Sequence, residues 1–75
     1  MNEPTHVAYS VLSTARVQAY QEEAVAFVRA QKEPPPFPRL VRALEMRTAV
    51  GWRIVAPLLE SGVLRVRDGG FVAPE

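Results

Sequence analysis

The fold is decided by three adjoining stretches: PRLVRALEM at 38–46, RTAVGWRIVAPLLESG at 47–62 and VLRVRDGGFVA at 63–73. In the first stretch, Leu40, Val41 and Leu44 recur at helical spacing. Pro38 suits a first helical position, because its missing amide proton costs nothing there. The pattern predicts a helix over 38–46, followed by a short turn.

The next stretch predicts a helix over 48–61. Val50, Ile54 and Leu58 fall on one face, flanked by Val55 and Leu59. The opposite face carries Thr48, Ala49, Trp52, Arg53, Ala56 and Glu60. We expect Thr48 to cap this helix and Gly62 to end it in a left-handed conformation. Pro57 removes a backbone hydrogen bond mid-helix and predicts a kink, with a break into two pieces as the alternative.

The third stretch predicts a β-hairpin over 63–73. Val63, Leu64 and Val66 precede Asp68-Gly69-Gly70, and Phe71, Val72 and Ala73 follow. Asp-Gly and Gly-Gly favour hairpin turns, because glycine accepts positive φ.

The first half of the chain predicts one helix and a connector. Ser13 or Thr14 can cap a helix over 13–32, whose core-facing stripe would comprise Val17, Tyr20, Ala24, Phe27 and Val28. Prolines in the connector 33–37 (EPPPF) cannot donate to a sheet ladder, so any pairing with the hairpin should be minimal. A Pro-rich ligand motif is the weaker alternative for this run. Residues 1–12 permit a short strand, or a contact with a second copy.

This order of elements predicts one domain over 13–75, mainly α with a small β-hairpin. Helix, helix, turn, helix and hairpin is the outline of a winged helix-turn-helix, with three helices plus a wing. At 75 residues the chain has room for one such domain.

Composition argues against catalysis and against metal or cofactor binding. The chain has no cysteine and a single histidine, His6, without a nearby carboxylate cluster. No nucleophile–base arrangement, phosphate loop, transmembrane stretch or signal peptide stands out. We therefore expect a cytoplasmic protein that is no enzyme and has no small-molecule substrate.

Charge is concentrated in the predicted helix-turn-helix and wing. The whole chain has a net charge of +1, but residues 34–67 hold six arginines against Glu45 and Glu60. A basic half can attract phosphates even when the total charge is small. The predicted DNA-binding residues are Arg39, Arg42, Arg47, Thr48, Ala49, Trp52, Arg53, Arg65 and Arg67. Arg53 is the candidate for reading guanine, and the other arginines are candidates for holding phosphates.

From Glu23 to Val72 the chain resembles the winged-helix gamma domain of FtsK-type DNA translocases. The matching parts are EEAVAFV, LVRALEM and RIVAPLLESGVL. The family's recognition helix carries an Asn-Arg pair near its start and a later arginine. Here Ala49 and Val50 occupy the first two positions, so only Arg53 is carried over. The resemblance implies DNA binding by a free-standing winged helix, without a motor.

The sequence thus predicts sequence-specific binding of double-stranded DNA by a small transcriptional regulator, or by a plasmid or phage accessory factor. Helix 48–61 would lie in the major groove, and the wing would lie on the backbone or minor groove. A homodimer is expected, because two half-sites multiply specificity. The alternative is a protein–protein interaction module that docks on a host complex. A buried Trp52 and a contiguous basic face would favour DNA, and an exposed Trp52 ringed by Val55 and Leu59 would favour a protein partner.

Overall fold

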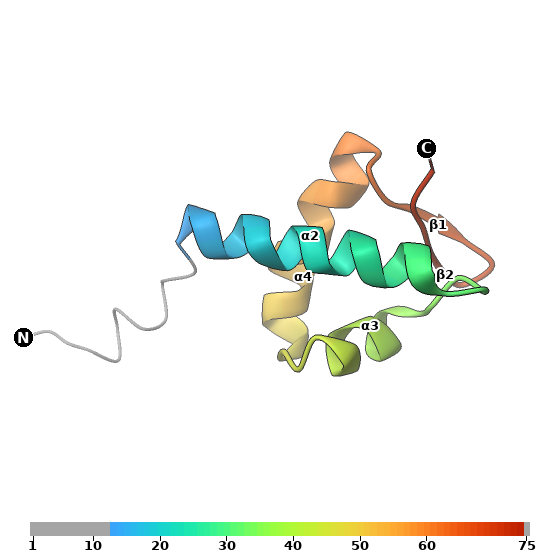
Figure 1. Cartoon of the computed structure of the whole chain (residues 1–75), viewed down its shortest axis with the longest axis horizontal. Coiled ribbons are helices and arrows are strands. Elements are labelled where there is room, and N and C mark those ends of the chain that lie inside the picture. The colour runs from blue at the N-terminus through green and yellow to red at the C-terminus, as the bar shows by residue number, and fades with distance from the viewer. Residues whose placement is uncertain (1–12, 75) are drawn as a thin grey trace, which may run out of the picture.

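The structure, a computed structural model, describes residues 13–74 of the chain. Within this range three α-helices precede a two-stranded antiparallel hairpin (Figure 1). The elements are α2 (Thr14–Ala30), α3 (Phe37–Ala43), α4 (Thr48–Ser61), β1 (Arg65–Arg67) and β2 (Gly70–Val72). The coarse class expected from the sequence, mainly helical with a small hairpin, is confirmed. The predicted strand or dimer contact at 1–12 lies outside the described residues.

Helix α2 begins as predicted and ends two residues early. The Ser13 hydroxyl accepts a hydrogen bond from the Arg16 backbone N–H at 3.3 Å, so Ser13 is the cap. Ala30 is the last helical residue, and Gln31 has extended backbone. The backbone N–H of Gln31 donates to the Val28 carbonyl and its side-chain amide donates to the Phe27 carbonyl. These bonds satisfy carbonyls that a longer helix would have used.

Helix α3 differs from its predicted range of 38–46 at both ends. It begins at Phe37, which makes Pro38 the second helical residue, and it ends at Ala43. Glu45 has a left-handed φ of 55°. The Glu45 N–H donates to the Arg42 carbonyl and the Met46 N–H donates to the Val41 carbonyl. This pair of bonds is a Schellman motif, which usually has glycine where Glu45 stands.

Helix α4 has the predicted bounds and is continuous through Pro57, so the predicted alternative of a break is wrong. Proline deprives the Arg53 carbonyl of its usual helical donor. The side-chain amide of Gln21, from α2, donates to the neighbouring Ile54 carbonyl at 3.3 Å. Gly62 ends the helix with a φ of 84°, as expected.

The hairpin pairs Arg65 with Val72 and Arg67 with Gly70 across a two-residue turn. Asp68 and Gly69 in this turn both have positive φ, as in the type I′ turns that match strand twist. On its other side β2 meets the connector, where the Phe71 N–H donates to the Pro35 carbonyl at 2.9 Å. The expected minimal pairing between connector and hairpin is confirmed.

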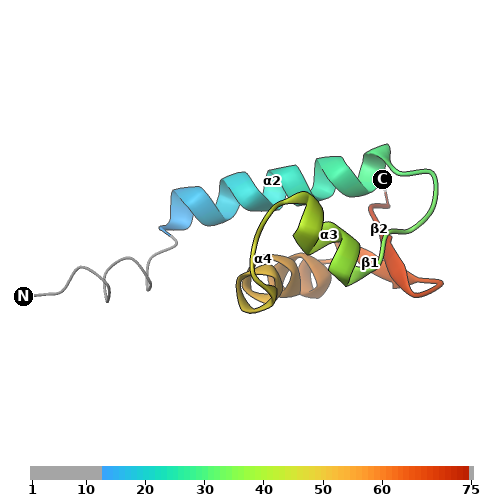
Figure 2. The ribbon, with the colours of Figure 1, turned by 90° about the horizontal axis from the view of Figure 1, so that it is seen from below.

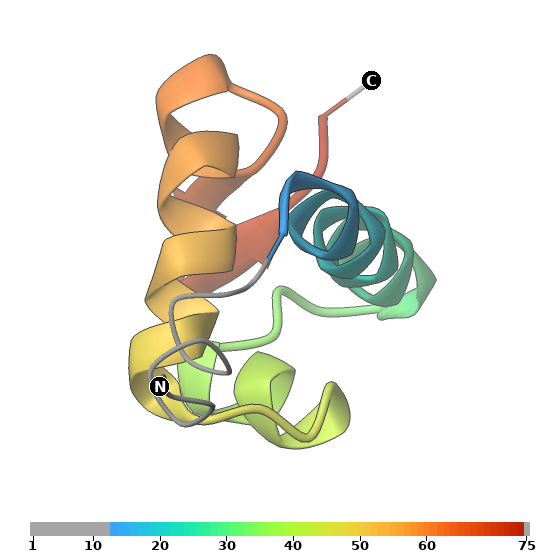
Figure 3. The ribbon, with the colours of Figure 1, turned by 90° about the vertical axis from the view of Figure 1, so that its left-hand side faces the viewer.

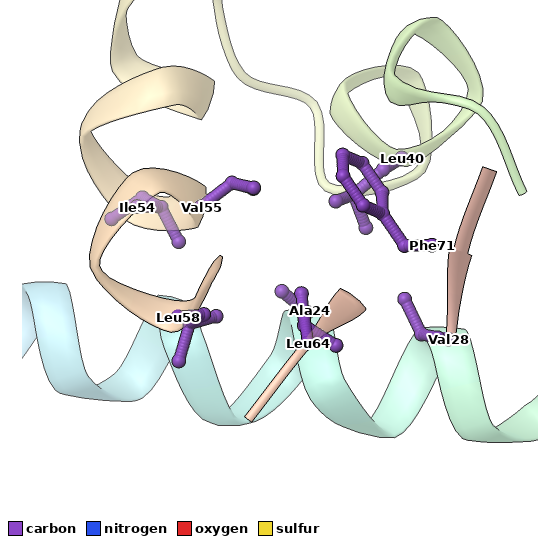
Figure 4. Packing of buried hydrophobic residues seen from close by; sticks show 8 residues of the cluster. All are labelled: Ala24, Val28, Leu40, Ile54, Val55, Leu58, Leu64 and Phe71. Atoms are coloured by element: carbon purple, nitrogen blue, oxygen red, sulfur yellow. The ribbon is translucent and has the colours of Figure 1, made fainter. Parts of the chain in front are cut away.

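One core joins the three helices, β2 and Leu64, the residue that precedes β1 (Figure 4). Its buried residues are Ala24, Val28, Leu40, Ile54, Val55, Leu58, Leu64 and Phe71. The residues predicted for the α2 stripe all belong to this core or pack against it. Helix α4 and the hairpin pack on the same core as α2. This shared core fixes the position of α4 relative to the hairpin.

The elements lie in two layers. In Figure 2, α2 runs along one side of the molecule, and α4 and the hairpin lie along the opposite side. Figure 3 views α2 nearly end-on while α4 stands upright, so the two helices cross at a steep angle. The surface away from α2 is therefore formed by α4 together with the hairpin.

Candidate nucleic-acid interface

The outer face of α4 carries four of the predicted site residues. Gly51, Ile54, Val55 and Leu58 are buried, while Thr48, Ala49, Trp52 and Arg53 are exposed. At 100° per residue, the positions pointing most directly away from the core are Ala49, Arg53, Ala56 and Glu60. Arg53 thus lies between two alanines, on a helix whose opposite face is held in the core.

Trp52 lies on the flank of this outer face, against α3. Its ring stacks on that of Phe37 with centroids 4.1 Å apart and an interplanar angle of 17°. Phe37 in turn meets Phe71 of β2 edge-on at 6.5 Å. Trp52 is 45% exposed, so the buried Trp52 that would favour DNA is not found, and Val55 is only 1% exposed and so does not ring it. The indole is therefore a partly exposed side chain of α4 that is held against α3 by Phe37.

Gly51 positions this flank, and we did not identify it from the sequence. A Cβ at Gly51 would overlap Cγ1 of Val41 and would lie 3.0 Å from Cζ of Phe37. The missing side chain lets α3 approach α4 closely enough for Phe37 to stack on Trp52. A lone glycine on the apolar side of a helical pattern was the available signal, because such a glycine usually has a packing reason.

The capping residue of α4 differs from the prediction, although the bounds of the helix do not. Arg47, not Thr48, is the N-cap residue, with extended backbone and no side-chain cap hydrogen bond, and Thr48 is the first helical residue. Because Thr48 is already helical, its hydroxyl is not at the N-cap position and does not cap the helix.

All six predicted arginines have exposed side chains. Arg39 and Arg42 lie on α3, next to the N-terminal end of α4, where Arg47 also lies. Arg65 and Arg67 lie on β1. Apart from Arg53 on the outer face of α4, the arginines therefore occur in two groups, one near the start of α4 and one on the hairpin.

Within residues 13–74, no group of three or more His, Cys, Asp or Glu side chains could hold a metal ion. None of the helices in this range is long and apolar enough to cross a membrane.

Comparison with protein-family models, with curated proteins and with solved structures finds no match for this chain.

Proposed function

We propose that this protein is a winged helix-turn-helix that binds double-stranded DNA, with α4 as the recognition helix and the β1–β2 hairpin as the wing. The order of the elements supports this assignment, as does the short turn between α3 and α4. The hydrogen bond from Phe71 to Pro35 adds a third extended segment to the wing. The surface that would face DNA is centred on α4 and the hairpin (Figure 2).

The observation that carries the proposal is the division of α4 into a buried face and an outer face centred on Arg53. The methyl side chains of Ala49 and Ala56 would let the helix backbone come close to the base edges. A guanidinium can bond guanine O6 and N7 together, so Arg53 would read guanine. Glu60 lies further along the same face, where its carboxylate would repel phosphates. The N-terminal half of α4 would therefore enter the groove.

Two groups of arginines would hold the DNA backbone. Arg39, Arg42 and Arg47 would contact phosphates beside the start of α4, and Arg65 and Arg67 would do so from the wing. We propose on this basis a role in occupying DNA, as a transcriptional regulator or a plasmid or phage accessory factor. A homodimer would double the contacted half-sites.

A salt-titrated binding assay on a random-sequence duplex tests the function. If the five phosphate-contacting arginines each displace a condensed counterion, the logarithm of the affinity should fall with the logarithm of salt with a slope of about −3 to −5. Salt-independent binding, or no binding to duplex DNA, would overturn the proposal.

The second candidate is a protein–protein interaction module. Trp52 is 45% exposed and Val66, the cross-strand partner of Phe71, is 64% exposed, and partner proteins often bury such side chains. Under this alternative Trp52→Ala would abolish partner binding while Arg53→Ala would leave it intact. Under the DNA proposal, Arg53→Ala should weaken duplex binding more than Trp52→Ala does.

A further inference from the structure

A hollow of about 320 Å³ lies between the C-terminal end of α2, the connector and the hairpin. The end of α2 and the hairpin lie close together at the right of Figures 1 and 2, far from the N-terminal end of α2. Val28 and Phe71, both buried, contribute its apolar lining. The hollow is therefore a place where two segments distant in sequence present side chains to one site.

Three cationic side chains line this hollow: Arg29 from the last turn of α2, Lys32 from the segment that follows α2, and Arg67 from β1. All three are exposed, and Glu33 is the one acidic residue among the lining side chains. A concave site with charges of mainly one sign focuses its field on an incoming ion. The helix dipole alone accounts for a cation in the last turn of α2, where Arg29 lies. It does not account for Arg67, which a different element supplies.

The two arginines of the hairpin, Arg65 and Arg67, lie in different surroundings. Side chains alternate along a strand, so Arg65 and Arg67 share one face of the hairpin, and Val66 points to the other. Arg67 lines the hollow and Arg65 does not. The wing arginine nearest the turn, Arg67, thus lines the same hollow as Arg29 of α2 and Lys32 of the segment after α2.

The chemistry of the lining favours a phosphate group. Guanidinium groups bind phosphate oxygens in a bidentate manner, and an ammonium adds a point charge. Phe71 is the only aromatic residue in the lining and it is buried, so the hollow offers no ring on which a base could stack.

We propose that this hollow is a phosphate-binding site, and that in the DNA complex it takes a backbone phosphate at a position separate from α4. The second half of this statement rests on the proposed DNA-binding function. The site adds Arg29 and Lys32, which lie outside the helix-turn-helix and wing, to the residues that contact DNA.

The test compares two substitutions on the same helix. Arg29→Gln removes a cation from the hollow, and Arg16→Gln makes the same change at an exposed position in the first turn of α2, outside the hollow. In the salt-titrated duplex assay, Arg29→Gln with Arg67→Gln should reduce the steepness of the salt slope by about one, because the hollow takes one phosphate, and Arg29→Gln alone should reduce it by part of that amount. Arg16→Gln should leave the slope unchanged. Equal slopes for Arg29→Gln and Arg16→Gln in a protein that binds duplex would overturn the site and leave the DNA proposal standing.

A second measurement separates this site from DNA binding. Inorganic phosphate is titrated into the isotope-labelled protein, and backbone amide shifts are followed by NMR. Saturable shifts at residues 29–33 and 67, lost in the Arg29→Gln, Arg67→Gln double variant, would support the phosphate site even if the wild type binds no duplex. Absence of saturable shifts there would overturn it. Circular dichroism of each variant checks that it is folded.

Discussion

Trp52 and Phe37 stack face to face, with ring centroids 4.1 Å apart. The pair joins the exposed flank of α4 to the first residue of α3, and the edge of Phe71 extends this contact to the hairpin. The proposed recognition helix and wing are therefore connected through one aromatic cluster formed by Trp52, Phe37 and Phe71.

Removing Phe37 should loosen this cluster. We expect Phe37→Ala to lower the free energy of unfolding by about 2–4 kcal/mol, because it removes packing from both Trp52 and Phe71. It should also change the emission of Trp52, the single tryptophan of the chain. Urea denaturation and fluorescence measure the two effects. Phe27→Ala is the control, since Phe27 packs on the core outside this cluster, and it should destabilise without altering the emission of the native state. An unchanged emission in Phe37→Ala would contradict the stacked arrangement.

Gly51→Ala should destabilise the protein although alanine is the better helix former. Its Cβ would overlap Val41 and crowd Phe37, and such overpacking costs about 1–3 kcal/mol. The intrinsic gain from glycine to alanine in a helix is about 1 kcal/mol. Combining Gly51→Ala with Val41→Ala should recover part of the loss, which a double-mutant cycle measures. Thr48→Ala, at an exposed position of the same helix, is the control. A more stable Gly51→Ala variant would show that α3 and α4 are less closely packed.

The two glycines near the hairpin turn should respond differently to alanine. Gly69 has a φ of 78° with open space around its missing Cβ, so Gly69→Ala should cost about 1 kcal/mol from backbone conformation alone. A Cβ at Gly70 would overlap the Pro34 carbonyl, so Gly70→Ala should push β2 off the connector and break the bond from Phe71 to Pro35. Hydrogen exchange at the Phe71 amide should then accelerate beyond the loss of global stability in Gly70→Ala only. Equal exchange in both variants would argue against this contact.

Arg53 and Arg42 should affect DNA binding in different ways. Arg53→Ala should relax preference at one base pair by about 1–3 kcal/mol, because a bidentate contact to guanine is lost. Arg42→Ala should weaken binding to all sequences alike, as loss of a phosphate contact does. Competition binding with a randomised duplex library distinguishes the two outcomes. Identical sequence profiles for the two variants would assign Arg53 to the backbone.

Local rules predicted much of the fold. The apolar period gave α4 its bounds despite Pro57, because core packing by Ile54 and Leu58 outweighs one lost backbone bond. The cap at Ser13 and the left-handed Gly62 followed from single-residue chemistry. The end of α3 did not, because a glutamate stands at the left-handed position that glycine usually fills.

Features that depend on tertiary packing could not be predicted from the spacing of apolar residues along the sequence. The stacking of Trp52 on Phe37 depends on the close approach that Gly51 permits between two helices. The hollow that contains Arg29 and Lys32 exists only because the hairpin folds back beside the end of α2. In the sequence, two cations near a helix C-terminus are expected from the helix dipole alone, so they did not indicate a site. The clustering of arginines along the sequence therefore indicated Arg67 as a binding residue, but it did not indicate Arg29 or Lys32, which line the same hollow.

The bond from Phe71 to Pro35 has a consequence for self-association. An unpaired strand edge can template further strands from other molecules, which leads to aggregation. On the connector side of β2, the outermost segment is proline at 34, 35 and 36, which has no N–H to offer an incoming chain. The other edge, β1, carries two exposed arginines that repel a second copy of itself. One edge of this small sheet is thus blocked by missing donors and the other by like charge, so we expect the hairpin, with its three-residue strands, not to pair with strands of other copies.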